Sequence, residues 1–105
     1  MRVLAHLDVP EAADLMIKAT AHRSEFVRWA AVTGLRRLRL KRARPVLNKA
    51  AADRASLVRG SAVDALKSIG DESSLPVLEK RLRDRYPGIR SAAADAIEAI
   101  NRRKR

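Results

Sequence analysis

Histidines, serines and acidic residues are the side chains of this sequence that could support catalysis or bind a metal. The two histidines, His6 and His22, have no ligand or catalytic partner at a suitable spacing, and the chain contains no cysteine. No Ser–His–Asp set and no glycine-rich phosphate loop is indicated. We therefore expect a protein that is not an enzyme, with no catalytic residues, no metal site and no cofactor.

Basic residues are the chemical feature that stands out. The chain has 23 Lys and Arg against 12 Asp and Glu, a net charge of +11. Small domains need a net charge of only about 2–8 for solubility. The surplus predicts an acidic partner, either a protein or a nucleic acid. The basic residues are densest in "RRLRLKRAR", residues 36–44, which holds six of them and no acid.

The composition predicts helices to carry these basic residues. The chain of 105 residues has three aromatic residues, four glycines and four prolines, so Ala, Leu, Val and Ile must build its core. Alanine, leucine and arginine favour helix. No apolar run approaches the ~20 residues of a membrane span, and the N-terminus lacks a signal-peptide pattern. We expect an all-α protein located in the cytoplasm, with no membrane partner.

An internal repeat of 31 residues is the strongest signal. Residues 24–54 and 55–85 share eleven identities without a gap, and a third copy runs from Tyr86 to Ile100. Each copy carries an apolar stripe at helical spacing, as in Val58, Ala62, Leu66 and Ile69. Helices are expected at 10–22, 24–38, 44–53, 56–69, 74–84 and 87–100. Helix pairs this short bury their apolar faces only by stacking.

The expected fold is therefore an α-solenoid of about three stacked helical hairpins forming a single domain, residues 1–105. The units are expected at about 8–38, 39–69 and 70–100. Residues 1–7 resemble the end of a further unit, whose open side would allow oligomerisation. Residues 101–105 are interpreted as a frayed tail.

The units resemble HEAT-like repeats of the short kind first noted in phycobilisome lyases. The resemblance rests on "VR..A...L", on "LPVL" at Leu75, and on Asp53 and Asp84, each followed six residues later by an arginine. It implies that the matched Asp and Arg residues bond along the stack. A structural ladder is thus expected from Arg28, Asp53, Arg59, Asp84 and Arg90. In the first unit, His22 stands in the place of the aspartate.

In solenoids of this type the second helix of each unit lines the face where partners bind. Trp29 is expected on an exposed ridge of that face, and Phe26 is expected in the core. Residues 36–44 are interpreted as a functional addition, because the same segment of the next unit, "KSIGDESSL", has a single lysine. The candidate partner-binding residues are Trp29, Thr33, Arg36, Arg37, Arg39, Lys41, Arg42, Arg44 and Lys67.

Two functions remain open. The resemblance favours a non-catalytic scaffold or adaptor that binds a protein with an acidic surface. The alternative is sequence-independent binding of nucleic acid through its phosphate backbone, which the charge favours. With few aromatic residues, base stacking is not expected.

Overall fold

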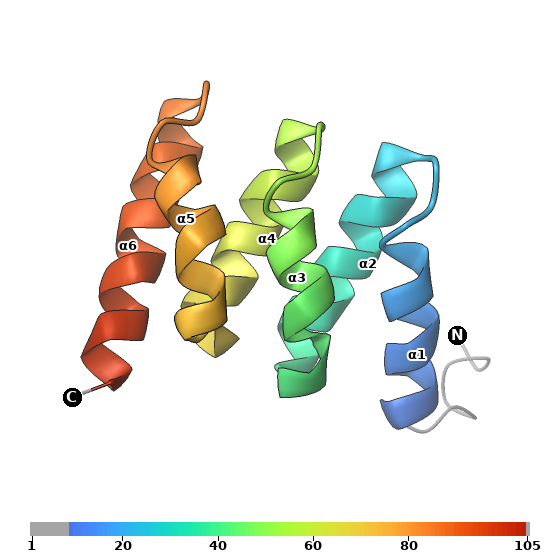
Figure 1. Cartoon of the computed structure of the whole chain (residues 1–105). Helices are drawn as coiled ribbons and strands as arrows, with labels where there is room; N and C mark the ends of the chain where they lie inside the picture. The colour runs from blue at the N-terminus through green and yellow to red at the C-terminus, as the bar shows by residue number, and fades with distance from the viewer. Residues whose placement is uncertain (1–8, 105) are drawn as a thin grey trace.

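Three helical hairpins form the computed structural model, which describes residues 9–104 (Figure 1). The hairpins pair α1 (Val9–Ala19) with α2 (Glu25–Leu38), α3 (Arg44–Ala50) with α4 (Ser56–Ile69), and α5 (Leu75–Arg81) with α6 (Pro87–Arg103). Short 3-10 turns, Lys41–Ala43 and Glu72–Ser74, precede α3 and α5. No strand occurs between residues 9 and 104. The unit predicted at residues 1–7 lies outside the described residues.

The hairpins stack side by side in two layers (Figure 1). Helices α2, α4 and α6 pack against one another in sequence order, and α1, α3 and α5 each pack on the second helix of their own hairpin. The first hairpin lies at one end of the stack and the last at the other. This arrangement is an α-solenoid, as the repeat predicts.

Local sequence signals set the helix boundaries. The Ser24 side chain accepts a hydrogen bond from the Val27 amide and caps α2. Pro45, Pro76 and Pro87 lie in the first turns of α3, α5 and α6, where a missing N–H costs nothing. Helix α1 ends three residues earlier than predicted.

Small and branched apolar side chains fill the interior. Leu35, Leu47, Leu66 and Leu78 are completely buried. Ala62 is also fully buried, and so are alanines of α1 and α6. These short side chains allow neighbouring helices to approach closely, so no aromatic residue is needed in the core.

The prediction that Phe26 lies in the core was wrong, and one apolar position of the repeat differs in exposure between units. Phe26 is 68% exposed, because its position at the start of α2 faces solvent, as does the equivalent Leu57. Val27 is 37% exposed although its counterparts Val58 and Ile89 are buried. The counterparts of Val27 face the preceding second helix, and none of the described helices occupies that place beside α2.

The prediction of a frayed tail was wrong for residues 101–104. Helix α6 continues to Arg103, whose guanidinium donates hydrogen bonds to the carbonyls of Lys67 and Gly70 at the end of α4. The Lys104 Nζ atom forms an ion pair of 3.3 Å with Oε1 of Glu72. These contacts hold the last turn of α6 against the preceding unit.

Candidate interaction surface

A groove between the C-terminal halves of α2 and α4 gathers five of the predicted partner-binding residues. It has a volume of about 660 Å³ and is called the basic groove below. Its lining consists of Thr33, Arg36, Arg37, Arg39, Asp64, Lys67 and Ser68. The repeat places these residues together, because α2 and α4 present equivalent positions along adjacent parallel faces.

Arg39 reaches this groove through an unusual backbone conformation. Its φ of 52° lies in the left-handed region, and its N–H closes α2 by donating to the Leu35 carbonyl. This conformation costs a non-glycine residue about 1–2 kcal/mol. At the equivalent position Gly70 ends α4 with a φ of −65°. An arginine thus occupies a position where glycine would be less strained.

The basic groove has a surplus of positive charge. It holds four cationic side chains and a single carboxylate, Asp64. The Arg36 guanidinium lies 4.0 Å from Asp64, and both side chains are about half exposed. Such surface ion pairs contribute little free energy, so the arginines remain available to an acidic partner. The Thr33 hydroxyl instead shares a hydrogen bond of 3.0 Å with Ser61 on α4.

The other basic residues of the 36–44 segment lie elsewhere. Arg42 contacts Asp14 at 2.8 Å and the Pro10 carbonyl, and thereby attaches the first 3-10 turn to α1. Arg44 donates to the Ile69 carbonyl at 2.7 Å and contacts Asp71 at 2.9 Å. Arg42 and Arg44 thus also contact neighbouring elements of the fold, in addition to any role in binding.

Lys41 and Trp29 are separate from the basic groove. Lys41 is exposed on the 3-10 turn before α3. Trp29 is 39% exposed on α2, and it is not part of the basic groove lining. Trp29 is thus accessible, but the structure does not bring it together with Arg36 and Arg37.

A second, more apolar groove adjoins the first. It lies between α4 and α6, has a volume of about 360 Å³ and shares Asp64 with the basic groove. We call it the apolar groove, and its lining is Ser56, Leu57, Gly60, Asp64, Tyr86, Gly88, Ile89 and Ala92. Sequence reasoning missed this groove. The sequence feature that indicates this groove is Gly60, which stands where the preceding unit has the bulky Trp29 and so leaves space between α4 and α6.

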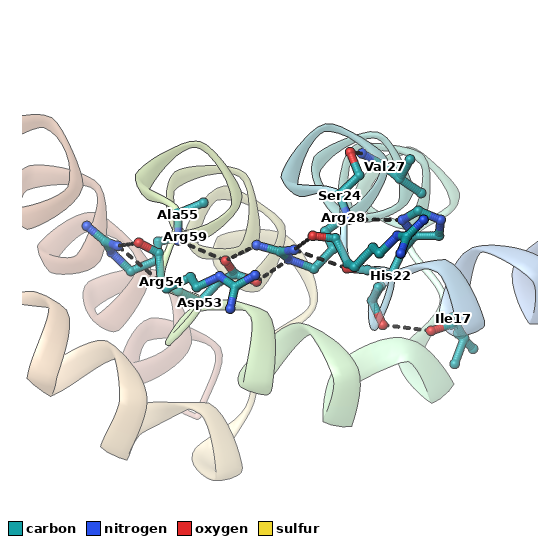
Figure 2. A network of polar contacts seen from close by, with 11 residues as sticks. Ile17, His22, Ser24, Val27, Arg28, Asp53, Arg54, Ala55 and Arg59 are labelled. Carbon is teal, nitrogen blue, oxygen red and sulfur yellow. Dashed lines mark hydrogen bonds and ion pairs between the residues drawn. The ribbon is translucent and has the colours of Figure 1, made fainter.

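Buried arginines connect successive units, and Figure 2 shows the connection between Arg28 and Asp53. Arg28 donates from Nε and Nη2 to the Asp53 carboxylate at 2.9 and 3.0 Å. Arg59 repeats this pairing with Asp84 at 2.8 and 3.1 Å. The Nη1 group of each arginine donates to two backbone carbonyls of its own unit, those of His22 and Arg23 or of Asp53 and Arg54.

Each aspartate of the ladder contacts the arginines of two successive units. Arg59 contacts the backbone carbonyl of Asp53, while the Asp53 carboxylate binds Arg28 of the preceding unit. Arg28 is therefore fully paired even though His22 replaces an aspartate in its own unit. Arg90 is exposed and donates from Nη1 to the carbonyls of Asp84 and Arg85.

The ladder shifts the pKa values of its acids. Burial alone raises the pKa of the Asp84 carboxyl, but hydrogen bonds from Arg59 and from the Tyr86 amide outweigh burial, so its pKa lies below 3.8. Asp53 behaves in the same way: burial is opposed by hydrogen bonds from Arg28 and the Ala55 amide, and its pKa is lowered. Both acids are therefore charged at neutral pH.

Residues 9–104 show neither a metal-binding cluster nor a membrane-spanning helix. Residues 9–104 contain no group of three or more His, Asp or Glu side chains placed to hold a metal ion. His6 lies outside the described residues, and the His22 ring accepts a hydrogen bond from the Ser24 amide. None of the helices described above is long and apolar enough to cross a membrane.

Stacked helical hairpins joined by buried Asp–Arg pairs define the chain as an α-solenoid repeat protein. The profile of HEAT repeats matches residues 1–66 and again residues 27–98. The chain therefore belongs to the HEAT repeat family, whose members commonly serve as scaffolds for protein interactions. A comparison with curated proteins gives no significant match.

Proposed function

We propose that the chain is a non-catalytic HEAT repeat scaffold that binds an acidic protein segment in the basic groove. The observation that supports this proposal is the convergence of Arg36, Arg37, Arg39 and Lys67 around one open groove. Arginines dominate binding energies at many protein interfaces, and their planar guanidinium groups can each hold a carboxylate by two hydrogen bonds.

The adjoining apolar groove favours a protein over a nucleic acid. A peptide can place acidic side chains in the basic groove and apolar side chains against Leu57 and Tyr86, which are 42% and 44% exposed. A phosphate backbone would meet the Asp64 carboxylate between the two grooves and would gain nothing from the apolar one. The proposed ligand is therefore a segment with Asp or Glu next to one or two large apolar residues.

Selection from a displayed library of random peptides tests this proposal. Acidic peptides with a large apolar residue should be enriched, and their binding should be measured by fluorescence anisotropy. Arg36→Glu/Arg37→Glu should weaken binding by about tenfold or more, since each lost charge-assisted contact contributes about 1.5–3 kcal/mol. Gly60→Trp should also weaken it by filling the apolar groove. A Cβ at Gly60 makes only an ordinary contact of 3.8 Å with Ile89.

The control for charge is Lys80→Glu/Arg83→Glu. It makes the same change in net charge at two exposed residues near the end of α5, outside both grooves. Peptide binding should survive this double substitution. Equal losses in the groove variant and the control would indicate a general charge effect and contradict the proposal.

Nucleic-acid binding is the second candidate, favoured by the net charge of +11. Random-sequence duplex DNA tests it in the same anisotropy assay across a salt series. If about five phosphates were neutralised, log K would fall against log salt with a slope near −4 to −5. Tight, steeply salt-dependent DNA binding that is lost in Arg36→Glu/Arg37→Glu, with no peptide enriched, would replace the leading proposal.

A further inference from the structure

The C-terminal end of the stack exposes positions that are buried in the preceding unit. On α4, Arg59 and Val63 are 9% and 0% exposed, whereas their α6 counterparts Arg90 and Ala94 are exposed. On the other layer, Ala51 after α3 is fully buried, and its counterpart Leu82 after α5 is 42% exposed. These positions differ because in the preceding unit they face the next hairpin.

Arg90 is held in the same way as the two ladder arginines. Its Nη1 group donates to the carbonyls of Asp84 and Arg85, as the Nη1 group of Arg59 donates to those of Asp53 and Arg54. In Arg28 and Arg59 the remaining edge, Nε and Nη2, binds a carboxylate. Among residues 9–104, Arg90 has no acceptor for that edge.

The open edge of Arg90 has the geometry of a carboxylate site. Two parallel N–H groups of a guanidinium match the two oxygens of a carboxylate, and the molecule itself shows this match twice. The backbone carbonyls fix one end of the Arg90 side chain before any partner arrives. Less rotamer entropy is therefore lost when a carboxylate binds there.

We propose that the C-terminal end of the stack, formed by Arg90, Ala94 and Leu82, docks a helical hairpin of a partner protein that presents an aspartate to Arg90. The aspartate completes a third rung of the ladder. Ala94 lets the partner helix approach closely, and Leu82 supplies apolar contact area. This surface is separate from the basic groove, so its test is independent of the proposed function.

The sequence argues against a second copy of this chain as the occupant. Stacked head to tail, a second copy would place its first unit on α6. The residue at the pairing position of that unit is His22, whose imidazole ring lacks the two parallel acceptor oxygens of an aspartate. A different protein with an aspartate at that position fits the site better.

A tethered hairpin provides the first test. Residues 70–100 are duplicated in tandem within the full chain, so that the copied Asp84 falls 25 residues after Arg90, the separation of Arg59 from Asp84. Exchange of the Arg90 Nε proton, followed by NMR, should slow by about tenfold or more relative to the natural chain. Changing the copied aspartate to asparagine should restore fast exchange.

Two results of this test would overturn the proposal. One is an added hairpin that folds no further helix, because the end of the stack would then not accept a hairpin. The other is equal Arg90 exchange with aspartate and with asparagine in the added unit. Arg90→Lys in the tandem chain is the matched variant: it keeps the charge, loses the planar edge and should lower the melting temperature.

The natural chain provides a second test, with acetate as the probe. The Arg90 Nε signal should shift and saturate at a lower acetate concentration than that of Arg83, an exposed arginine in the turn after α5. The signals of Arg28 and Arg59 should not move. Identical responses of Arg90 and Arg83 would contradict a formed site. Sedimentation equilibrium should show a monomer, and a dimer abolished by Arg90→Glu would overturn the choice of partner.

Discussion

At the scale of single residues, the direction in which each arginine points decides its role. Arg59 and Arg36 are both arginines on second helices, but Arg59 is 9% exposed and Arg36 reaches solvent in the basic groove. The first is enclosed by backbone carbonyls and a buried carboxylate. The second forms an ion pair of 4.0 Å with the half-exposed Asp64.

Arg59→Ala should therefore destabilise the fold far more than Arg36→Ala. Removing Arg59 leaves the Asp84 carboxylate, whose side chain is 1% exposed, without its main partner. Breaking one side of a buried pair costs about 3–5 kcal/mol, while surface substitutions usually stay within about 0.5 kcal/mol. Urea denaturation at pH 7 measures both free energies of unfolding, and equal values would refute the structural role of Arg59.

The ladder acids also predict how stability depends on pH. The pKa values of Asp53 and Asp84 are lower in the folded chain than their ordinary value of 3.8. The folded state therefore binds protons less readily than the unfolded state, and these acids stabilise the fold fully above pH 3.8. That stabilisation is lost as the pH falls below 3.8 and passes through the lowered pKa values.

Thermal melts between pH 7 and pH 2 should show this loss as a falling melting temperature below about pH 4. Asp84→Asn should be less stable at pH 7, and its melting temperature should fall less steeply in acid. An Asp84→Asn profile parallel to that of the natural chain would show that this carboxyl does not carry the dependence.

At the scale of helices and turns, Arg39 at the end of α2 affects both the stability of the fold and the proposed peptide binding. Arg39→Gly should raise the free energy of unfolding by up to about 1 kcal/mol, because glycine adopts a φ of 52° without strain. The same change should weaken binding of the selected acidic peptides, since it removes a cation from the basic groove. Chemical denaturation and anisotropy on one preparation measure both effects.

A matched variant makes the Arg39 prediction specific. Arg37→Gly removes a cation from the same groove, but it lies within α2 at an ordinary helical position, where glycine costs about 1 kcal/mol. Arg39→Gly and Arg37→Gly should thus change stability in opposite directions and peptide binding in the same direction. Destabilisation by both would show that the left-handed conformation of Arg39 is not strained.

The helices could be predicted from sequence because their signals are local. Pro45 and Pro76 mark helix starts, and the apolar stripe of α4 fixes its buried face. Contacts between units were harder to predict. The resemblance implied that Asp and Arg bond along the stack, but the sequence spacing does not say which arginine each aspartate binds. The stacking of units gives each carboxylate to the arginine 25 residues before it.

The candidate site was predictable only in part for a related reason. Residues 36–44 are continuous in sequence, but α2, a left-handed residue, a 3-10 turn and α3 divide them. Arg36, Arg37 and Arg39 therefore reach the basic groove, while Arg42 and Arg44 hold neighbouring elements. The turn geometry that separates them depends on tertiary packing and leaves no pattern in the sequence.

At the scale of the whole molecule, stability should be distributed along the stack. Helix α4 packs on both α2 and α6, whereas each of those packs on a single second helix within residues 9–104. In such repeat proteins each unit is stabilised by its nearest neighbours. The middle hairpin therefore has two stabilising interfaces where each outer hairpin has one.

Amide hydrogen exchange tests this distribution directly. Amides of α4 should exchange most slowly, at the rate of global unfolding, and those of α1 and α6 should exchange faster through opening of the outer hairpins. Arg59→Ala should accelerate exchange in α6 more than in α2, because it breaks the rung between the second and third hairpins. Arg28→Ala should do the reverse. Uniform exchange in all helices would instead show that the stack unfolds as one cooperative unit.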